Sequence, residues 1–459
     1  MIQFFHYKGH VSTKECGEII DNLKYKVFNW FICAYIGSKS SLSLRSTPSS
    51  RNQKISRVSS KHSSQFANAK IEQSFTLGNR CVVLSNFSQE TLKVSTNPAY
   101  VNTIEHVVQS VCCTIFVNAV NEYDFLMEVF GMDAEVATTE VYRTFSLTLD
   151  ITKVMFDQML FECHDLIGLL ISLSIVKRCQ TLFKFKSFNR LERQFYEFFQ
   201  SFWLKFHSTV LSHIQKISEY TPIYTVSFDE CHLVTKRVSG VLAAIYAVLP
   251  DFEPNKLLMT FTQFIQEWEN FILIQASIFD IRKEQLVYEI VNYNMVLSIL
   301  SAQTHIPLVA ERINIPVIYQ DSSKLCSDLV KELNKRYKNM INQVCLEELA
   351  PFFERLISFT NCFTGTSNTN EDEIMELSNH FAATWKNSLM VVAVDIKKLF
   401  APSYIDQEIK EVCMSMLIDY YRKFVGILSN HYPVMYSKLV SKDKIVDIHQ
   451  ILVEIKKYR

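Results

Sequence analysis

Glycine and proline are scarce in this chain, which has 9 Gly and 10 Pro among 459 residues. Most tight turns and many helix ends use glycine, and proline commonly marks a turn. A chain with so few of both is expected to form long elements with few tight turns. This favours helices over a sandwich or barrel of many strands, and the length allows two or three domains.

The charges of the chain are balanced. Lys+Arg and Asp+Glu each number 47, so the formal net charge is zero. A protein that binds nucleic acid normally carries a basic excess that replaces the counterions of the phosphates. No such excess covers the predicted folded part, so nucleic acid is not expected as a partner.

The cysteines and the apolar runs point to the cytosol. None of the 12 Cys forms a C-x-x-C pair, which favours buried free thiols over a zinc or redox site. The N-terminus, MIQFFHYKGH, lacks the layout of a signal peptide. The apolar runs 27–36 and 166–176 are shorter than the ~20 residues that span a bilayer. We expect a soluble chain whose membrane association is peripheral, with 166–176 in a core helix.

Changes of composition predict five segments. Residues 1–37 contain a short helical piece. Residues 38–64 hold 12 Ser and six Lys or Arg without an acidic residue, which indicates a flexible linker, with contact to anionic lipid as the alternative. Residues 65–102 are expected to form an extended lead-in. A helical bundle is expected over 103–225, and further C-terminal helical bundles over 226–459.

Helical periodicity dominates from residue 101 onward. Two apolar stripes with spacings of three and four residues stand out: Leu286, Ile290, Tyr293, Leu297 and Leu300, and then Ile445, Ile448, Leu452 and Ile455. Such stripes are typical of helices that pack along their length. The fold class predicted is all-α, with consecutive helical bundles that form an elongated rod.

The breaks between the expected helices fall mostly at proline residues. The predicted helices are 103–131, 137–178, 188–218, 232–249, 254–302, 323–348, 351–363, 371–400, 405–430 and 442–458.

No motif for catalysis is present in the sequence. There is no glycine-rich phosphate loop, no H-E-x-x-H and no G-x-S-x-G, so neither an enzyme nor a cofactor is predicted. Cys163 and Cys231 are each followed by histidine, but adjacent side chains on a helix diverge by about 100°. A cytosolic hydrolase that uses Cys163 or Cys231 is the alternative of another class.

Three separated blocks carry a family resemblance. They are ENFILIQASIFDIRKEQLVYEIVNYNMVLSIL at 269–300, FAATWKNSLMVVAVDIKKLF at 381–400 and DIHQILVEIKKY at 447–458. The weaker segments FTLGNR, at 75–80, and YRTFSLTL, at 142–149, follow the same order. Together they resemble the vacuolar protein sorting-associated protein 52 family from about residue 75 to the end. The signature positions, expected to be structural or partner-binding, are Arg282, Lys283, Glu284, Gln285, Asn292, Tyr293, Trp385 and His449.

The resemblance implies a function. Members of this family are non-catalytic subunits of the Golgi-associated retrograde protein complex and of the related endosome-associated recycling complex. These complexes capture vesicles at the trans-Golgi network and promote SNARE-mediated fusion. The partners implied are companion subunits, small GTPases of the Rab and Arl kinds, SNARE proteins and a peripheral contact with membrane. The location implied is the cytosolic face of the trans-Golgi network and endosomes.

The sequence departs from the family pattern at its beginning. Family chains begin with a long coiled-coil region through which subunits assemble, whereas one short helical piece precedes the Ser-rich segment here. A fragment, an isoform and an incomplete gene model would each account for this. The chain is expected to fold as the C-terminal rod and to assemble poorly. A subunit of a related tether, of the exocyst or oligomeric Golgi type, is the nearest alternative.

Overall fold

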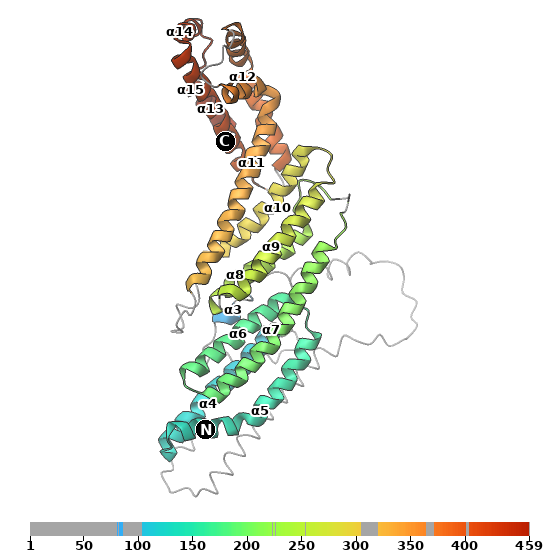
Figure 1. Cartoon of the computed structure of the whole chain (residues 1–459), viewed down its shortest axis with the longest axis vertical. Helices are drawn as coiled ribbons and strands as arrows, with labels where there is room; N and C mark the ends of the chain where they lie inside the picture. Colours follow the sequence, from blue (N-terminus) through green and yellow to red (C-terminus); the bar gives the residue numbers. More distant parts are fainter. Residues whose placement is uncertain are drawn as a thin grey trace, which may run out of the picture. The chain divides into compact units, whose positions relative to one another are not determined.

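The computed structural model describes residues 80, 82–85, 103–222, 224, 226–252, 254–303, 320–363, 371–400 and 404–458 (Figure 1). Every regular element within these ranges is a helix. The predicted all-α class of consecutive helical bundles is therefore confirmed. The described residues belong to two compact units.

The first unit is built around α6, Leu166–Phe185, which is buried on nearly all sides. The surrounding helices are α3 (Val82–Ser85), α4 (Ile104–Phe130), α5 (Ala134–Glu162) and most of α7 (Asn189–Ser218). Helix α4 packs along both α5 and α6. Phenylalanines fill the core, and the ring of Phe156 meets those of Phe198 and Phe202 edge to face. The apolar run 166–176 predicted a core helix here. This is confirmed, because 78% of the most apolar 18-residue stretch of α6 is buried.

Helices α8 and α9 contribute to both units. Their bounds are Leu233–Val248 and Pro254–Ala276, and a 3₁₀ turn, η3 (Leu249–Asp251), lies between them. The first unit takes 240–263, and the second takes 217–239 and 264–301.

The second unit continues with α10 (Arg282–Gln303) and the later part of α11 (Gln320–Cys362). Its remaining elements are α12 (Glu371–Phe400), α13 (Asp406–His431), α14 (Pro433–Ser441), α15 (Ile448–Ile455) and η6 (Lys456–Tyr458). Helix α13 packs against α12, α14 and α15. The rings of Phe381 and Tyr421 stack at 4.4 Å between centroids, which joins α12 to α13.

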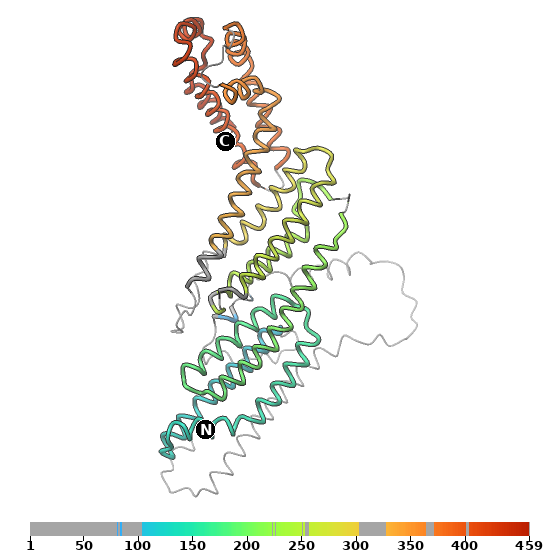
Figure 2. Tube along the Cα trace, in the orientation of Figure 1, coloured from blue at the N-terminus to red at the C-terminus, as the bar shows by residue number. Residues whose placement is uncertain are grey.

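Three of the predicted helices were wrong in extent. The predicted helix 137–178 is two helices, because Asp165 caps a new one by accepting a 3.0 Å hydrogen bond from the Gly168 amide. The predicted helix 254–302 breaks at 277–281. By contrast, the predicted break between 323–348 and 351–363 is confirmed, because α11 contains Pro351 and consists of two helices that meet at a kink, where Phe353 has the non-helical angles φ −126° and ψ 16°. Figure 2 shows this part of the trace in orange.

The third correction concerns the C-terminus. The predicted helix 442–458 was wrong, since α14 ends at Ser441 and α15 begins at Ile448. Asp447 caps α15 by accepting a 3.1 Å hydrogen bond from the His449 amide. The stripe of Leu286 to Leu300 is confirmed, because its five members are all buried. The C-terminal stripe was partly wrong: Leu452 is 37% exposed, and Ile451 is buried beside Ile455.

The predicted segments 1–37 and 38–64 lie outside the described residues, as does 65–102 apart from residues 80 and 82–85. The division into five segments and the arrangement of the bundles as a rod stay predictions.

Candidate functional site

The first turn of α10 brings four of the signature residues together. Arg282 Nη1 donates to Gln285 Oε1 at 3.0 Å, and Gln285 Nε2 donates to the Phe279 carbonyl at 2.8 Å. Lys283 Nζ pairs with Glu348 Oε1 at 2.5 Å, a carboxylate that is 3% exposed. Glu284 lies at the positive end of the helix dipole. This cluster fixes the loop before α10 and fastens α10 to α11.

Asn292, about two turns further along α10, is the centre of a buried polar network. Its Oδ1 accepts from the Thr235 hydroxyl at 2.6 Å and from the His232 amide at 3.0 Å. Its Nδ2 donates to the Tyr288 carbonyl at 2.8 Å. Trp268 Nε1 donates to Thr235 Oγ1 at 3.0 Å. Since Asn292 is fully buried, these bonds replace those it would make with water, and they join α8, α9 and α10.

Tyr293 belongs to a second network on the same helix. Its hydroxyl donates to Glu269 Oε1 at 2.6 Å, and Arg336 Nη1 reaches both oxygens of that carboxylate at 2.6 and 2.5 Å. Hydrogen bonding to Glu269 raises the pKa of Arg336. The Glu269 charge is thereby neutralised at the point where α9, α10 and α11 meet.

Trp385 and His449 lie on other helices. Trp385 is 3% exposed on α12 and packs into the core. His449 is exposed in the first turn of α15. Asn292, Tyr293 and Trp385 thus have packing roles in this structure, and a partner-binding role for the exposed signature positions stays a prediction.

The two cysteines of the hydrolase alternative sit in poor surroundings for a nucleophile. Burial raises the pKa of Cys163 to about 11 and that of Cys231 also to about 11. The thiol of Cys231 is directed at the Asn292 amide oxygen, 3.7 Å away. The ring of His232 lies against Tyr220 and Phe271, and burial lowers its pKa to about 4. Reactive thiols need the opposite, a lowered pKa.

We therefore predict that Cys163 and Cys231 react slowly with a thiol reagent. Iodoacetamide at pH 7.5, followed by mass spectrometry of the peptides, should label the exposed Cys362 before either of these two cysteines. Only the thiolate reacts, and a pKa near 11 leaves about one thiol in a thousand ionised or fewer. Labelling of Cys163 or Cys231 ahead of Cys362 in the folded chain would revive the hydrolase alternative.

One site in the first unit was missed by the sequence analysis. Arg80 Nε and Nη2 donate to the two oxygens of Glu105 at 2.7 and 2.9 Å. Its Nη2 and Nη1 also donate to the two oxygens of Asp165 at 2.6 and 3.2 Å. Burial opposes the charge on Glu105, but hydrogen bonds and the charge of Arg80 outweigh it and hold the pKa of Glu105 below its usual value. This Arg80 clamp ties the chain before α3 to α4 and α6.

Gly168 leaves the room that the Arg80 clamp needs. A Cβ added at this residue would lie 2.6 Å from Ile104 Cγ2, 2.8 Å from Arg80 Nη2 and 2.9 Å from Asp165 Oδ2. Such distances are far inside van der Waals contact, so the guanidinium would have to move.

We predict that Gly168→Ala lowers the free energy of unfolding by about 1–3 kcal/mol, as expected for overpacking, although alanine is the better helix former. Urea unfolding would measure this. The control is Gly426→Ala on α13, where nothing lies within 4 Å of the added Cβ and a slight stabilisation is expected. A stabilisation by Gly168→Ala as well would contradict the prediction.

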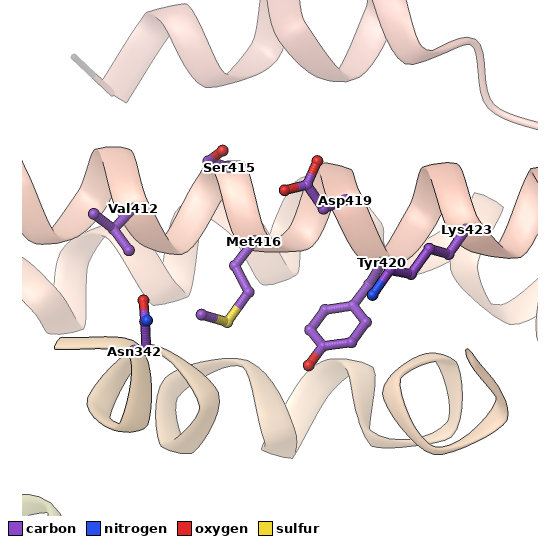
Figure 3. Close-up of a pocket in the computed structure, with 7 residues that line it drawn as sticks. All are labelled: Asn342, Val412, Ser415, Met416, Asp419, Tyr420 and Lys423. Atoms are coloured by element: carbon purple, nitrogen blue, oxygen red, sulfur yellow. The ribbon is translucent and has the colours of Figure 1, made fainter. Parts of the chain in front are cut away.

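A groove of about 360 Å³ lies between α11 and α13 in the second unit. In Figure 3, Met416 and Tyr420 point from α13 toward α11, and Asn342 points up from α11 toward Val412. Ser415, Asp419 and Lys423 complete the lining. The ammonium of Lys423 lies 5.6 Å from the Tyr420 ring centre. The lining mixes apolar and polar groups without a convergent set of titratable residues, so it suits surface contact more than chemistry.

Within the described ranges, no group of three or more His, Cys, Asp or Glu is placed to hold a metal ion. One described helix, α6, is long and apolar enough to cross a membrane by length and composition. Its burial among the other helices accounts for that composition without a membrane.

By its fold, the described part of the chain is an all-α helical-bundle protein. Its buried polar groups form hydrogen bonds that join one helix to another. The chain belongs to the family described as "Vps52, C-terminal", whose model matches residues 26–316.

Curated proteins agree with this family. The human vacuolar protein sorting-associated protein 52 homolog is 24% identical over 398 residues, which cover 84% of this chain and 52% of the relative. Vacuolar protein sorting-associated protein 52 A of Arabidopsis thaliana is 22% identical over 395 residues, with the same coverage. The chain thus spans about half the length of the curated relatives it matches. The match to the human relative covers 84% of this chain, which is more residues than lie between residue 1 and residue 316. The similarity therefore continues beyond residue 316.

Proposed function

We propose that this chain is a non-catalytic subunit of a multisubunit vesicle-tethering complex in retrograde transport from endosomes to the trans-Golgi network. The observation that carries the proposal is the family match over residues 26–316. It is supported by relatives from human and plant that are named for vacuolar protein sorting. Because the chain spans about half of each relative, the activity of the whole protein is part of the proposal.

The physical character of the chain suits a tether. A helix advances about 1.5 Å per residue, so the 43 residues of α11 correspond to about 65 Å of path. Long helices present surfaces without needing a cleft, and several weak contacts to different partners combine by avidity. The polar networks of Asn292 and of Glu269 keep the bundle in one arrangement, as a platform for such contacts requires.

The proposed partners are the companion subunits, GTPases of the Rab and Arl kinds, and SNARE proteins. The proposed location is the cytosolic face of the trans-Golgi network and endosomes, with peripheral attachment to membrane. Both the Golgi-associated retrograde protein complex and the endosome-associated recycling complex are possible assemblies, and their subunit lists distinguish them experimentally.

Proximity labelling in the native cell tests the proposal. A biotin ligase fused to this chain is expected to label tethering subunits and SNAREs of the trans-Golgi network above a control with the free ligase. Labelling suits weak contacts, which washing steps would lose. Enrichment of exocyst or oligomeric Golgi subunits would assign the chain to a related tether, and absence of all tether subunits would contradict the proposal.

A GTPase contact can be tested separately with purified proteins. GTP-locked and GDP-locked forms of candidate Rab and Arl proteins should be compared on immobilised chain. Preference for the GTP-locked form is expected if the contact is regulated. Equal retention of both forms by this chain would argue against a GTPase contact within it.

A further inference from the structure

Helix α12 carries an exposed, partly apolar stripe opposite the face that packs into the core. The inward face includes Trp385, Leu389 and Val392, which are at most 3% exposed. On the outward face, Met390 is 49% exposed and Val394 is 46% exposed. Within the part of the chain that the structure describes, the outward side chains of α12 are thus exposed, whereas its inward side chains are packed.

The outward stripe has the spacing of a coiled-coil seam. It consists of His380, Ala383, Asn387, Met390 and Val394, at steps of three, four, three and four residues. This spacing keeps all five side chains on one line of the helix. Val391, which is 37% exposed, flanks the seam. We call this stripe the α12 seam.

The charges at the two ends of the α12 seam are opposite. The first turn of α12 carries Glu371, Asp372 and Glu373, and Glu376 follows on the outward side. The last turn carries Lys397 and Lys398. A helix with an acidic start and a basic end is complementary to a second copy of itself that runs the opposite way.

We propose that the α12 seam is a self-association surface, on which α12 of a second copy of this chain docks antiparallel about a two-fold axis. The register that places Glu376 opposite Lys398 of the second copy also places His380 opposite Val394. In the same register Ala383 faces Val391 beside Met390, so a small side chain meets large ones. Asn387 then lies on the axis and faces its own counterpart.

Asn387 gives this register its specificity. An amide side chain has both donors and an acceptor, so two Asn387 side chains on the axis can hydrogen-bond to each other. A polar residue at one seam position favours the register that pairs it and disfavours slipped ones. From Glu376 to Lys398 the paired helices would run for about 33 Å.

Glu376 and Lys398 already form ion pairs within the chain, but these pairs are exposed and little free energy is lost if they are exchanged. Glu376 Oε1 lies 3.0 Å from Arg355 Nη1, but both side chains of that pair are about two-thirds exposed. Lys398 Nζ is 3.8 Å from Asp395 Oδ1 on its own helix. Exposed pairs of this kind are weak, so each can be shared or exchanged. The interface is short, and a weak, reversible dimer is expected.

Sedimentation equilibrium of the full chain over a range of concentrations tests the proposal. The chain should dimerise, and Glu376→Lys or Lys398→Glu alone should weaken the dimer about tenfold, because each puts like charges together at both ends. The double variant Glu376→Lys with Lys398→Glu restores opposite charges and should recover dimerisation. A matched control is Lys423→Glu on α13, which leaves the seam charges unchanged.

A cross-link tests the register. Asn387→Cys in a Cys362→Ser background should form a disulfide-linked dimer on mild oxidation, whereas Ser429→Cys on α13 should not. A chain that stays monomeric up to about 100 µM, where even weak interfaces fill, overturns the proposal. So does a dimer that ignores both charge reversals. If the chain is monomeric and the reversals instead alter capture of a companion subunit, the seam belongs to that partner.

Discussion

Replacing Arg80 with methionine is expected to lower the free energy of unfolding by about 3–5 kcal/mol, the cost of leaving a buried charge without its partner. The Glu105 side chain is fully buried, and the Arg80 side chain is 15% exposed. Methionine keeps most of the aliphatic length but offers no donor to Glu105 or Asp165. Urea unfolding followed by circular dichroism at pH 7.5 measures the loss.

The control for this prediction is Arg143→Met. Arg143 forms a 2.7 Å pair with Glu140 on the surface of α5, and its side chain is 78% exposed. Exposed pairs one helical turn apart contribute about 0.5 kcal/mol or less, so a change of that size is expected. A loss at Arg80 no larger than the loss at Arg143 would show that the clamp does not hold the first unit together.

The pH dependence of the Arg80 clamp follows from the direction of the Glu105 shift. The pKa of Glu105 is held below its usual value of 4.5 in the folded chain. Its contribution to stability is therefore present above the unfolded value and is lost as the pH falls through the lower folded value. In Arg80→Met the buried carboxylate lacks its cation and gains by taking up a proton. The difference between wild type and variant should accordingly shrink between pH 7.5 and pH 4.5.

The fold class could be predicted because its signal is local. Helices are indicated by the low Gly and Pro content and by apolar residues three and four positions apart, and both can be read without knowing which distant residues meet. The stripe from Leu286 to Leu300 is buried, as predicted. The break before α6 was missed because it depends on Asp165, whose side chain caps the helix. No proline or glycine marks that position. The break at 277–281 likewise depends on Gln285, which bonds the Phe279 carbonyl.

The interior networks could not be predicted, because they join residues far apart in the chain. Arg80 lies 85 positions from Asp165, and Thr235 lies 57 from Asn292. Residue types alone do not say which charges meet. The family signature did mark Asn292 and Tyr293, and the segment FTLGNR ends at Arg80, so resemblance pointed to the right residues without their roles. Trp385 is buried in the core, and a partner-binding role for the exposed signature positions stays a prediction.

Replacing Asn292 with leucine is expected to lower the free energy of unfolding by about 3 kcal/mol. Leucine has nearly the same size, so the loss comes from polar groups and not from a cavity. The His232 amide and the Thr235 hydroxyl each lose their acceptor inside the core, at about 1–3 kcal/mol for each group left unsatisfied. Urea unfolding, with the same substitution at the exposed Asn339 as a control near zero, gives the measurement.

A double-mutant cycle with Thr235→Val and Asn292→Leu measures how strongly the two residues depend on each other for stability. Thr235→Val removes the 2.6 Å bond to Asn292 and the acceptor of Trp268 Nε1, and about 1–2 kcal/mol is expected for it alone. If Thr235 and Asn292 act as one unit, the double variant should lose less than the sum of the single losses by 0.5 kcal/mol or more. Strict additivity, or a loss below about 1 kcal/mol for Asn292→Leu, would mean that the bonds of Asn292 are replaceable. Coupling would instead identify the network as the reason that α8, α9 and α10 hold a fixed arrangement, on which any surface presented by these helices depends.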